Sequence, residues 1–121
     1  MSNLSLNAQR VLLRAAELIN VRASWSKGFY EHGDKYCAIG ALQRAEREVV
    51  SEFDGHFNFD QAKKALVREV TELYRGAYSS VEDFNDDNGT AYEDVKALFC
   101  RTVSKHVDDP SLLEDNPDEP R

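Results

Sequence analysis

Apolar residues recur along most of the chain at intervals of three and four, the spacing that places them on one face of an α-helix. One such stretch covers residues 6–22, where Ser5 or Asn7 can supply the amino-terminal cap. A second covers residues 38–49 and presents mostly small side chains in its first turns. The pattern therefore predicts two amphipathic helices in the first half of the chain, the second of them suited to a close approach by a neighbouring element.

Two further helices are predicted in the second half, each with a recognisable start. Residues 58–77 keep the helical spacing, and Asn58 with Gln61 has the form of a capping pair. After the loop "FNDDNG", the run "TAYE" at residues 90–93 is a capping box that opens the last helix. We therefore expect a mainly α fold, a compact bundle of about four helices.

The stretch between the first two helices has a different pattern. Residues 25–36 are rich in aromatic side chains and contain the turn-forming run "HGDK" around Gly33. This favours a short β-hairpin or an ordered aromatic loop near residues 25–36.

Charge divides the chain into two parts. The 121 residues carry a formal charge of −7, yet residues 1–107 hold 14 basic and 16 acidic side chains, whereas residues 108–121 hold six acids and one arginine. A proline-punctuated acidic segment buries too little apolar surface to offset its ordering entropy. We expect a single all-α domain over residues 1–107 and an acidic, largely disordered tail over residues 108–121.

The composition also narrows the location and the ligands. No apolar run approaches the roughly 18 residues of a membrane span, and the start of the chain does not have the form of an export signal, so we expect a cytoplasmic protein with reduced cysteines. There is no phosphate-binding glycine motif, no zinc-like grouping of Cys and His, and no broad basic patch. We expect no cofactor, no metal and no direct contact with nucleic acid or membrane.

Cys37 is the one residue whose position suggests chemistry. It stands where a turn becomes a helix, and the positive end of a helix dipole favours the thiolate that a nucleophile requires. His32 as base, with Asn85 or Asp86 as the orienting group, would complete a catalytic set of the Cys-His-Asn type. The alternative is a small buried side chain in a tight helix contact, which is how most free cysteines behave and which we favour.

A second candidate site is the acidic run from Asp83 to Asp94. Its first, third, fifth and twelfth positions carry acids or amides as in a calcium loop, but Asn88 stands where the sharp turn needs glycine and Asp94 replaces the usual glutamate. A turn that leads into the last helix, with solvated carboxylates, fits this stretch better. Trp25 is either a core residue or a recognition anchor.

The combination of Trp25, "YCAIGAL" and "FNDDNGT" resembles a family of small bacterial and phage proteins known only as a domain of unknown function. The resemblance covers about residues 8–105, implies a bacterial or phage origin and adds no reaction. Its motif residues correspond to Trp25, Gly28, Cys37, Gly40, Ala41, Leu42, Asn85 and Asp86. Because Asn and Asp side chains bond backbone amides, we expect Asn85 and Asp86 to close their own loop and brace the start of the helix after Cys37.

Two function hypotheses follow from these observations. In the first, the protein is a small acidic helical interaction protein, a phage or bacterial inhibitor that binds a basic surface of a protein partner through Trp25, Asp83, Asp86 and Asp87. In the second, it is a cysteine-dependent hydrolase or transferase that uses Cys37. Amphipathic helices with small faces suit a monomer and a homodimer equally well.

Overall fold

The structure, a computed structural model, describes residues 4–27, 31–33, 35–49, 57–87 and 89–107, without the side chains of Arg22, Glu31 and His32. The expected acidic tail, residues 108–121, and the motif residue Gly28 lie outside the described residues. The described part is mainly helical and confirms the predicted fold class. Its elements in chain order are α1 (Leu6–Leu18), a 3₁₀ turn η1 (Arg22–Ser24), β1 (Glu31–His32), β2 (Lys35–Tyr36), α2 (Ala38–Val49), α3 (Phe57–Tyr74), α4 (Val81–Asp86) and α5 (Tyr92–His106).

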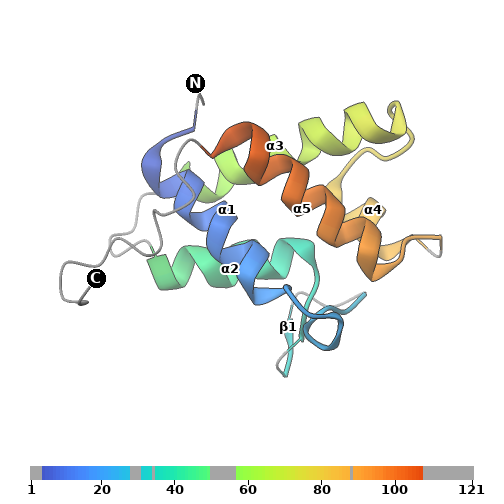
Figure 1. Cartoon of the computed structure of the whole chain (residues 1–121), viewed down its shortest axis with the longest axis horizontal. Coiled ribbons are helices and arrows are strands. Elements are labelled where there is room, and N and C mark those ends of the chain that lie inside the picture. The colour runs from blue at the N-terminus through green and yellow to red at the C-terminus, as the bar shows by residue number, and fades with distance from the viewer. Residues whose placement is uncertain (1–3, 28–30, 34, 50–56, 88, 108–121) are drawn as a thin grey trace.

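Helix α1 is the centre of the bundle. It contacts α2, α3 and α5, and α5 lies across α3 (Figure 1). The side chains of Val11, Leu12 and Ala15 on α1 are fully buried. Phe84 of α4 and Phe99 of α5 are the largest side chains of this core. The predicted apolar faces therefore meet around α1, as helical packing requires.

The start of α1 is fixed by a distant helix as well as by its own cap. Ser5 Oγ accepts a hydrogen bond from the Ala8 amide at 3.0 Å, which confirms Ser5 as the cap. Ser5 also donates its hydroxyl to Asn58 Oδ1 and its amide to Gln61 Oε1 at 2.9 Å. Asn58 and Gln61 thus bind Ser5, although their spacing predicts a cap for their own helix, because α3 packs against α1 at this point.

Helix α4 occupies a stretch that the sequence pattern assigns to a loop. Ser80 Oγ accepts from the Asp83 amide at 3.0 Å and caps its six residues. Helix α5 also begins slightly later than predicted, with Ala91 as its amino-terminal cap, and Asp94 Oδ2 accepts from the Ala91 amide at 2.9 Å. The acidic stretch after residue 80 is therefore a short helix with a tight connection to α5.

The predicted hairpin is present between η1 and α2. Strands β1 and β2 pair in antiparallel register, with Glu31 opposite Tyr36. Gly33 has φ of +63°, a left-handed conformation that favours glycine at the turn. Trp25 pairs with Tyr36 as a parallel bridge, and the Ser26 amide donates to the Tyr36 carbonyl at 3.0 Å. The hairpin thereby brings Trp25 beside the start of α2.

Among the residues that the structure describes, no helix is both long enough and apolar enough to cross a membrane.

Candidate functional site

Asn85, a buried residue near the end of α4, is the centre of a polar junction between three segments. Its Oδ1 accepts from the indole Nε1 of Trp25 at 2.7 Å and from the amide of Ala38, the first residue of α2, at 3.1 Å. Its Nδ2 donates to the Ser26 carbonyl at 3.2 Å and to Asp86 Oδ1 at 3.0 Å. The bond to Ala38 confirms the expected brace at the start of α2.

The orientation of the Asn85 amide follows from its neighbours. An indole N–H and a backbone N–H can only donate, so the atom that faces Trp25 and Ala38 must be the oxygen. The other side of the amide faces a carbonyl and a carboxylate, which only accept. Asn85 therefore satisfies donors on one side and acceptors on the other, which a hydrophobic residue or an acid at this position cannot do.

Cys37 lies beside this junction as the residue before α2. Its Sγ accepts from the Gly40 amide at 3.3 Å, its carbonyl accepts from the Ala41 amide at 2.9 Å, and the residue is 4 % exposed. Burial raises the pKa of the Cys37 thiol above its ordinary value, although the amide hydrogen bonds oppose the rise. The nearby charges of Asp86 and Glu82 raise the pKa further. The thiol is therefore held protonated, the opposite of what a nucleophile needs.

The described structure places only part of the catalytic alternative around Cys37. The side chain of His32 lies outside the described parts. Asn85, assigned to orient that histidine, instead uses its oxygen for Trp25 and Ala38. The geometry therefore gives Cys37 a capping and packing role at the start of α2.

The two cysteines are expected to react at very different rates with a thiol reagent. Cys100 is exposed on α5, whereas Cys37 is buried and must wait for a local opening. In the folded protein we expect one fast thiol and one at least roughly tenfold slower. A Cys100→Ser variant should retain only the slow phase. A fast phase in that variant at pH 7 would show that the Cys37 thiol is reactive and would support the catalytic alternative.

Trp25 is held within the fold by contacts on several sides. Besides the bond from its indole N–H to Asn85, its ring lies 6.2 Å from that of Tyr92, and Lys27 Nζ lies 5.7 Å from the ring centroid. Tyr92 in turn donates its hydroxyl to the Ile19 carbonyl at 3.0 Å. Trp25 therefore connects the hairpin with α4 and α5. Because its ring is partly buried, a partner protein would contact only the exposed part of the ring.

The acidic surface of α4, defined here as Asp83, Asp86 and Asp87, lies on the outside of the junction. All three residues are exposed. Asp83 Oδ2 accepts from the Ser79 hydroxyl at 2.8 Å, and Asp87 Oδ1 accepts from the Gly89 amide at 2.7 Å. In the described part of the chain, neither Asp83 nor Asp87 forms an ion pair through its carboxylate. The structure thus brings together the three acids that the sequence assigns to binding.

The calcium-like pattern does not form a ligand cage in the described residues. Its first four positions belong to α4, so their side chains diverge around a helix. No group of three or more His, Cys, Asp or Glu side chains in the described ranges is arranged to hold a metal ion.

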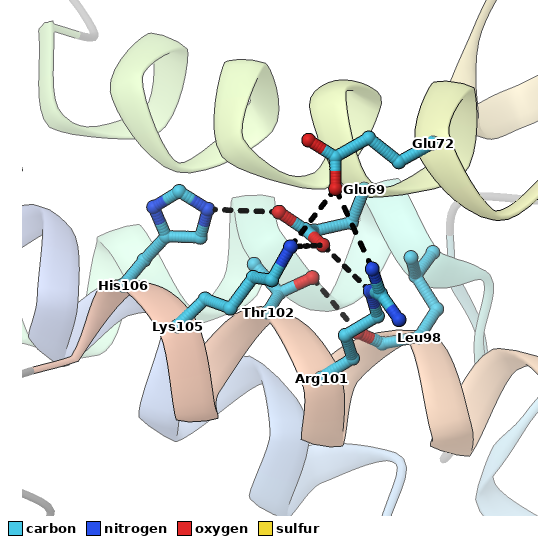
Figure 2. A network of polar contacts seen from close by, with 7 residues as sticks. All are labelled: Glu69, Glu72, Leu98, Arg101, Thr102, Lys105 and His106. Carbon is cyan, nitrogen blue, oxygen red and sulfur yellow. Dashed lines mark hydrogen bonds and ion pairs between the residues drawn. The ribbon is translucent and has the colours of Figure 1, made fainter.

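A second polar cluster, which the sequence analysis missed, joins α3 to α5. Glu69 is 1 % exposed, and its carboxylate lies 2.8 Å from Arg101 Nε, 3.2 Å from Lys105 Nζ and 3.1 Å from His106 Nε2. Figure 2 shows these three side chains of α5 converging on Glu69, with Glu72 beside them bridging to Lys105 at 2.9 Å. We call these five residues the Glu69 cluster.

Electrostatics explain why a charge is tolerated at this buried position. Burial alone would raise the pKa of the Glu69 carboxyl, but hydrogen bonds from Arg101, His106 and Lys105 outweigh it and lower the pKa below its ordinary value. The sequence signal was available, because Glu69 lies on the apolar stripe between Leu66 and Val70. A charged residue on such a stripe indicates a buried partner.

One comparison with known proteins gives a match. The model of a family described as a family of unknown function matches residues 4–105, which include α1 through the penultimate residue of α5. No curated protein and no solved structure matches the chain.

Proposed function

The chain belongs to the family of unknown function DUF6197, and we propose that it is a non-catalytic interaction protein that binds a basic surface of a partner protein. The observation that carries the proposal is the acidic surface of α4, where Asp83 and Asp87 are exposed and have no ion-pair partner in the described residues. The overall charge of −7 adds a long-range attraction towards basic partners.

The placement of these acids is only partly compensated within the protein, where Lys27 Nζ donates to the Asp87 carbonyl at 2.6 Å. Asp86 is the last residue of α4 and Asp87 its carboxyl-terminal cap, so both stand at the negative end of the helix dipole. Asp83 lies three and four positions before them, where like charges repel. A basic partner would relieve both effects at once, which supports a binding role for this surface.

The acidic surface is also held rigidly in place. Phe84 is 1 % exposed and its ring lies 5.1 Å from that of Tyr74 and 5.4 Å from that of Tyr78. Asn85 fixes the same helix to α2 and the hairpin. A surface that is already ordered loses little conformational entropy on binding, so more of the interaction energy is available for affinity.

In this proposal the protein is a bacterial or phage inhibitor, because its acidic surface occupies a basic face that the partner needs for another ligand. The resemblance to small bacterial and phage proteins supports the origin, and the acidic surface supports the mode of binding. The partner would associate rapidly, and salt would weaken the complex.

The test compares two variants of equal charge. The full chain is used to capture partners from an extract of its source cell, and the isolated partner is then titrated with wild type and with Asp83→Asn/Asp87→Asn. Both asparagines keep the oxygen that accepts from Ser79 or Gly89. We expect affinity to fall by roughly tenfold or more, as for the loss of close charge pairs across an interface.

The control is Glu17→Gln/Glu93→Gln, which changes two exposed acids elsewhere. Its affinity should stay within about twofold of wild type, since distant exposed charges are screened. A partner that binds the two double variants equally well, or whose affinity is independent of salt, would contradict the proposal.

A further inference from the structure

A hollow that is open to solvent lies over the outer face of α3, on the side of the helix opposite its buried stripe. Its volume is about 770 Å³. Its lining residues in the described part of the chain all belong to α3: Asp60, Lys63, Lys64, Val67, Arg68, Thr71 and Glu72. We call this the α3 cavity. It shares no lining residue with the acidic surface of α4 or with the Asn85 junction.

The charges in the α3 cavity are only partly balanced. Lys63 pairs with Glu82 at 3.2 Å, and Glu72 is bridged by Lys105 at 2.9 Å. Lys64 and Arg68, in contrast, form no ion pair among the described residues. They are four positions apart, so their charges repel on the same face of the helix. Asp60, four positions before Lys64, offsets one of these two charges. The described lining therefore keeps a small positive excess, which favours an anionic occupant.

Small apolar groups accompany these cations. Val67 is half-buried and lies between Lys64 and Arg68 in the cavity lining, where the aliphatic stems of the two basic side chains extend the apolar surface. An occupant with carboxylates and a few aliphatic side chains would complement both the basic side chains and the apolar surface. A simple inorganic anion would satisfy only the cations.

Residues 108–121 of the same chain have this chemistry. Their sequence, "DDPSLLEDNPDEPR", combines six acids with two adjacent leucines and only one basic residue. They follow Val107, the residue after α5. In the last turn of α5, Lys105 pairs with Glu72 of α3, and Glu72 lines the cavity. The acidic segment therefore starts close to one end of the α3 cavity.

The length of the segment is sufficient. Helical rise places Asp60 and Glu72, at the two ends of the lining, about 18 Å apart along α3. Fourteen residues reach up to about 46 Å when extended. A tethered segment also has an effective concentration in roughly the millimolar range, which favours it over a free acidic ligand of equal intrinsic affinity.

We propose that the α3 cavity is a docking surface for the acidic segment 108–121 of the same chain, whose carboxylates bind Lys64 and Arg68. The proposed contact involves none of the three acids of the acidic surface of α4. Its test involves no partner protein, so failure of this proposal and failure of the proposed function are distinguishable.

Zero-length carbodiimide cross-linking of the full chain tests the contact, because it joins only a carboxylate and an amine that touch. Peptide mass spectrometry should find residues 108–121 linked to Lys64. The Lys63–Glu82 pair is an internal positive control, since its atoms are 3.2 Å apart. Lys96 on α5 is exposed and lies about 16 Å before Val107 along the helix, within reach of the segment but outside the cavity.

Charge variants of the full chain sharpen the result. Arg68→Gln should lower the yield of the Lys64 link by up to roughly fivefold, the range expected for loss of an exposed ion pair. Lys96→Gln, of equal charge change, should leave that yield unchanged. Salt at about 1 M should suppress the Lys64 link through screening.

The outcomes that would overturn the proposal are specific. One is equal linkage of the segment to Lys64 and Lys96, which would indicate random collisions. Another is the absence of any Lys64 link while the Lys63–Glu82 link forms. A third comes from a mixture of ¹⁵N-labelled and unlabelled chains, where links of mixed isotope composition would show that the segment reaches a second copy instead of its own chain.

Discussion

Replacing Asn85 by alanine is expected to lower the free energy of unfolding by about 3 kcal/mol, because the Trp25 indole and the Ala38 amide lose their acceptor together. Both donors are part of the junction where the hairpin, α2 and α4 meet. A buried donor left without a partner costs about 1–3 kcal/mol. Denaturant unfolding of wild type and variant measures the difference.

The matched control for this substitution is Asn20→Ala. Asn20 is exposed after α1, and substitutions at such positions usually stay within about 0.5 kcal/mol. Trp25 is the single tryptophan, so its emission gives a second, local readout. We expect a red shift in Asn85→Ala and none in Asn20→Ala. Equal unfolding midpoints for the two variants would show that Asn85 does not stabilise the junction.

A double-mutant cycle with Trp25→Phe separates the indole contact from the bond to Ala38. Phenylalanine keeps most of the ring but removes the N–H donor to Asn85. If the contact contributes as a buried hydrogen bond, the two substitutions should couple by about 1 kcal/mol. Additive effects would mean that the indole bond contributes little and that Ala38 carries the effect of Asn85→Ala.

Replacing Glu69 by glutamine is expected to destabilise the protein by about 2 kcal/mol at neutral pH. Removing one member of a buried ion pair costs about 3–5 kcal/mol, and we lower this figure because Arg101 and Lys105 are partly exposed and can return to water. Glutamine keeps the shape and one acceptor oxygen. Glu72→Gln, an exposed carboxylate that shares the same two cations, is the matched control and should have a much smaller effect.

The effect of Glu69→Gln should also depend on pH in a defined direction. The pKa of Glu69 is lower in the folded protein than the ordinary carboxyl value of 4.5. Its ionised form therefore stabilises the fold fully above that value, and the contribution is lost as pH falls through the folded pKa. Wild type and Glu69→Gln should converge in stability in acid. A difference that stays constant from pH 7 to about pH 3 would contradict the electrostatic role of Glu69.

Local patterns predicted most of the helices but not all of their boundaries. Helix α2 begins at Ala38 and ends at Val49, as its apolar spacing predicts. Helix α4 was predicted as a loop because six residues are too few for a periodic pattern to emerge, and its acids are typical of turns. The bond from Ser5 to Asn58 was not predicted, because a cap residue and a residue that bonds another helix have the same chemistry.

The two polar sites differ in how far the sequence could predict them. Residue type alone suggested that the Asn85 side chain bonds a backbone amide near Cys37. In the structure that amide belongs to Ala38, which donates to Asn85 Oδ1. The Glu69 cluster joins residues at least 29 positions apart in α3 and α5, and no spacing rule connects them. Only the presence of a charge on an apolar stripe indicated that Glu69 needed a partner.

The position of Ser5 affects the order in which the chain can complete its structure during synthesis. The residue that caps α1 is itself held by Asn58 and Gln61, which follow it by 53 and 56 positions. Helix α1 is synthesised before the other described helices, yet the two side chains that hold Ser5 are translated only after α2 is complete. A nascent chain stalled before α3 therefore has an α1 whose amino-terminal end frays, and the arrival of α3 ends that fraying.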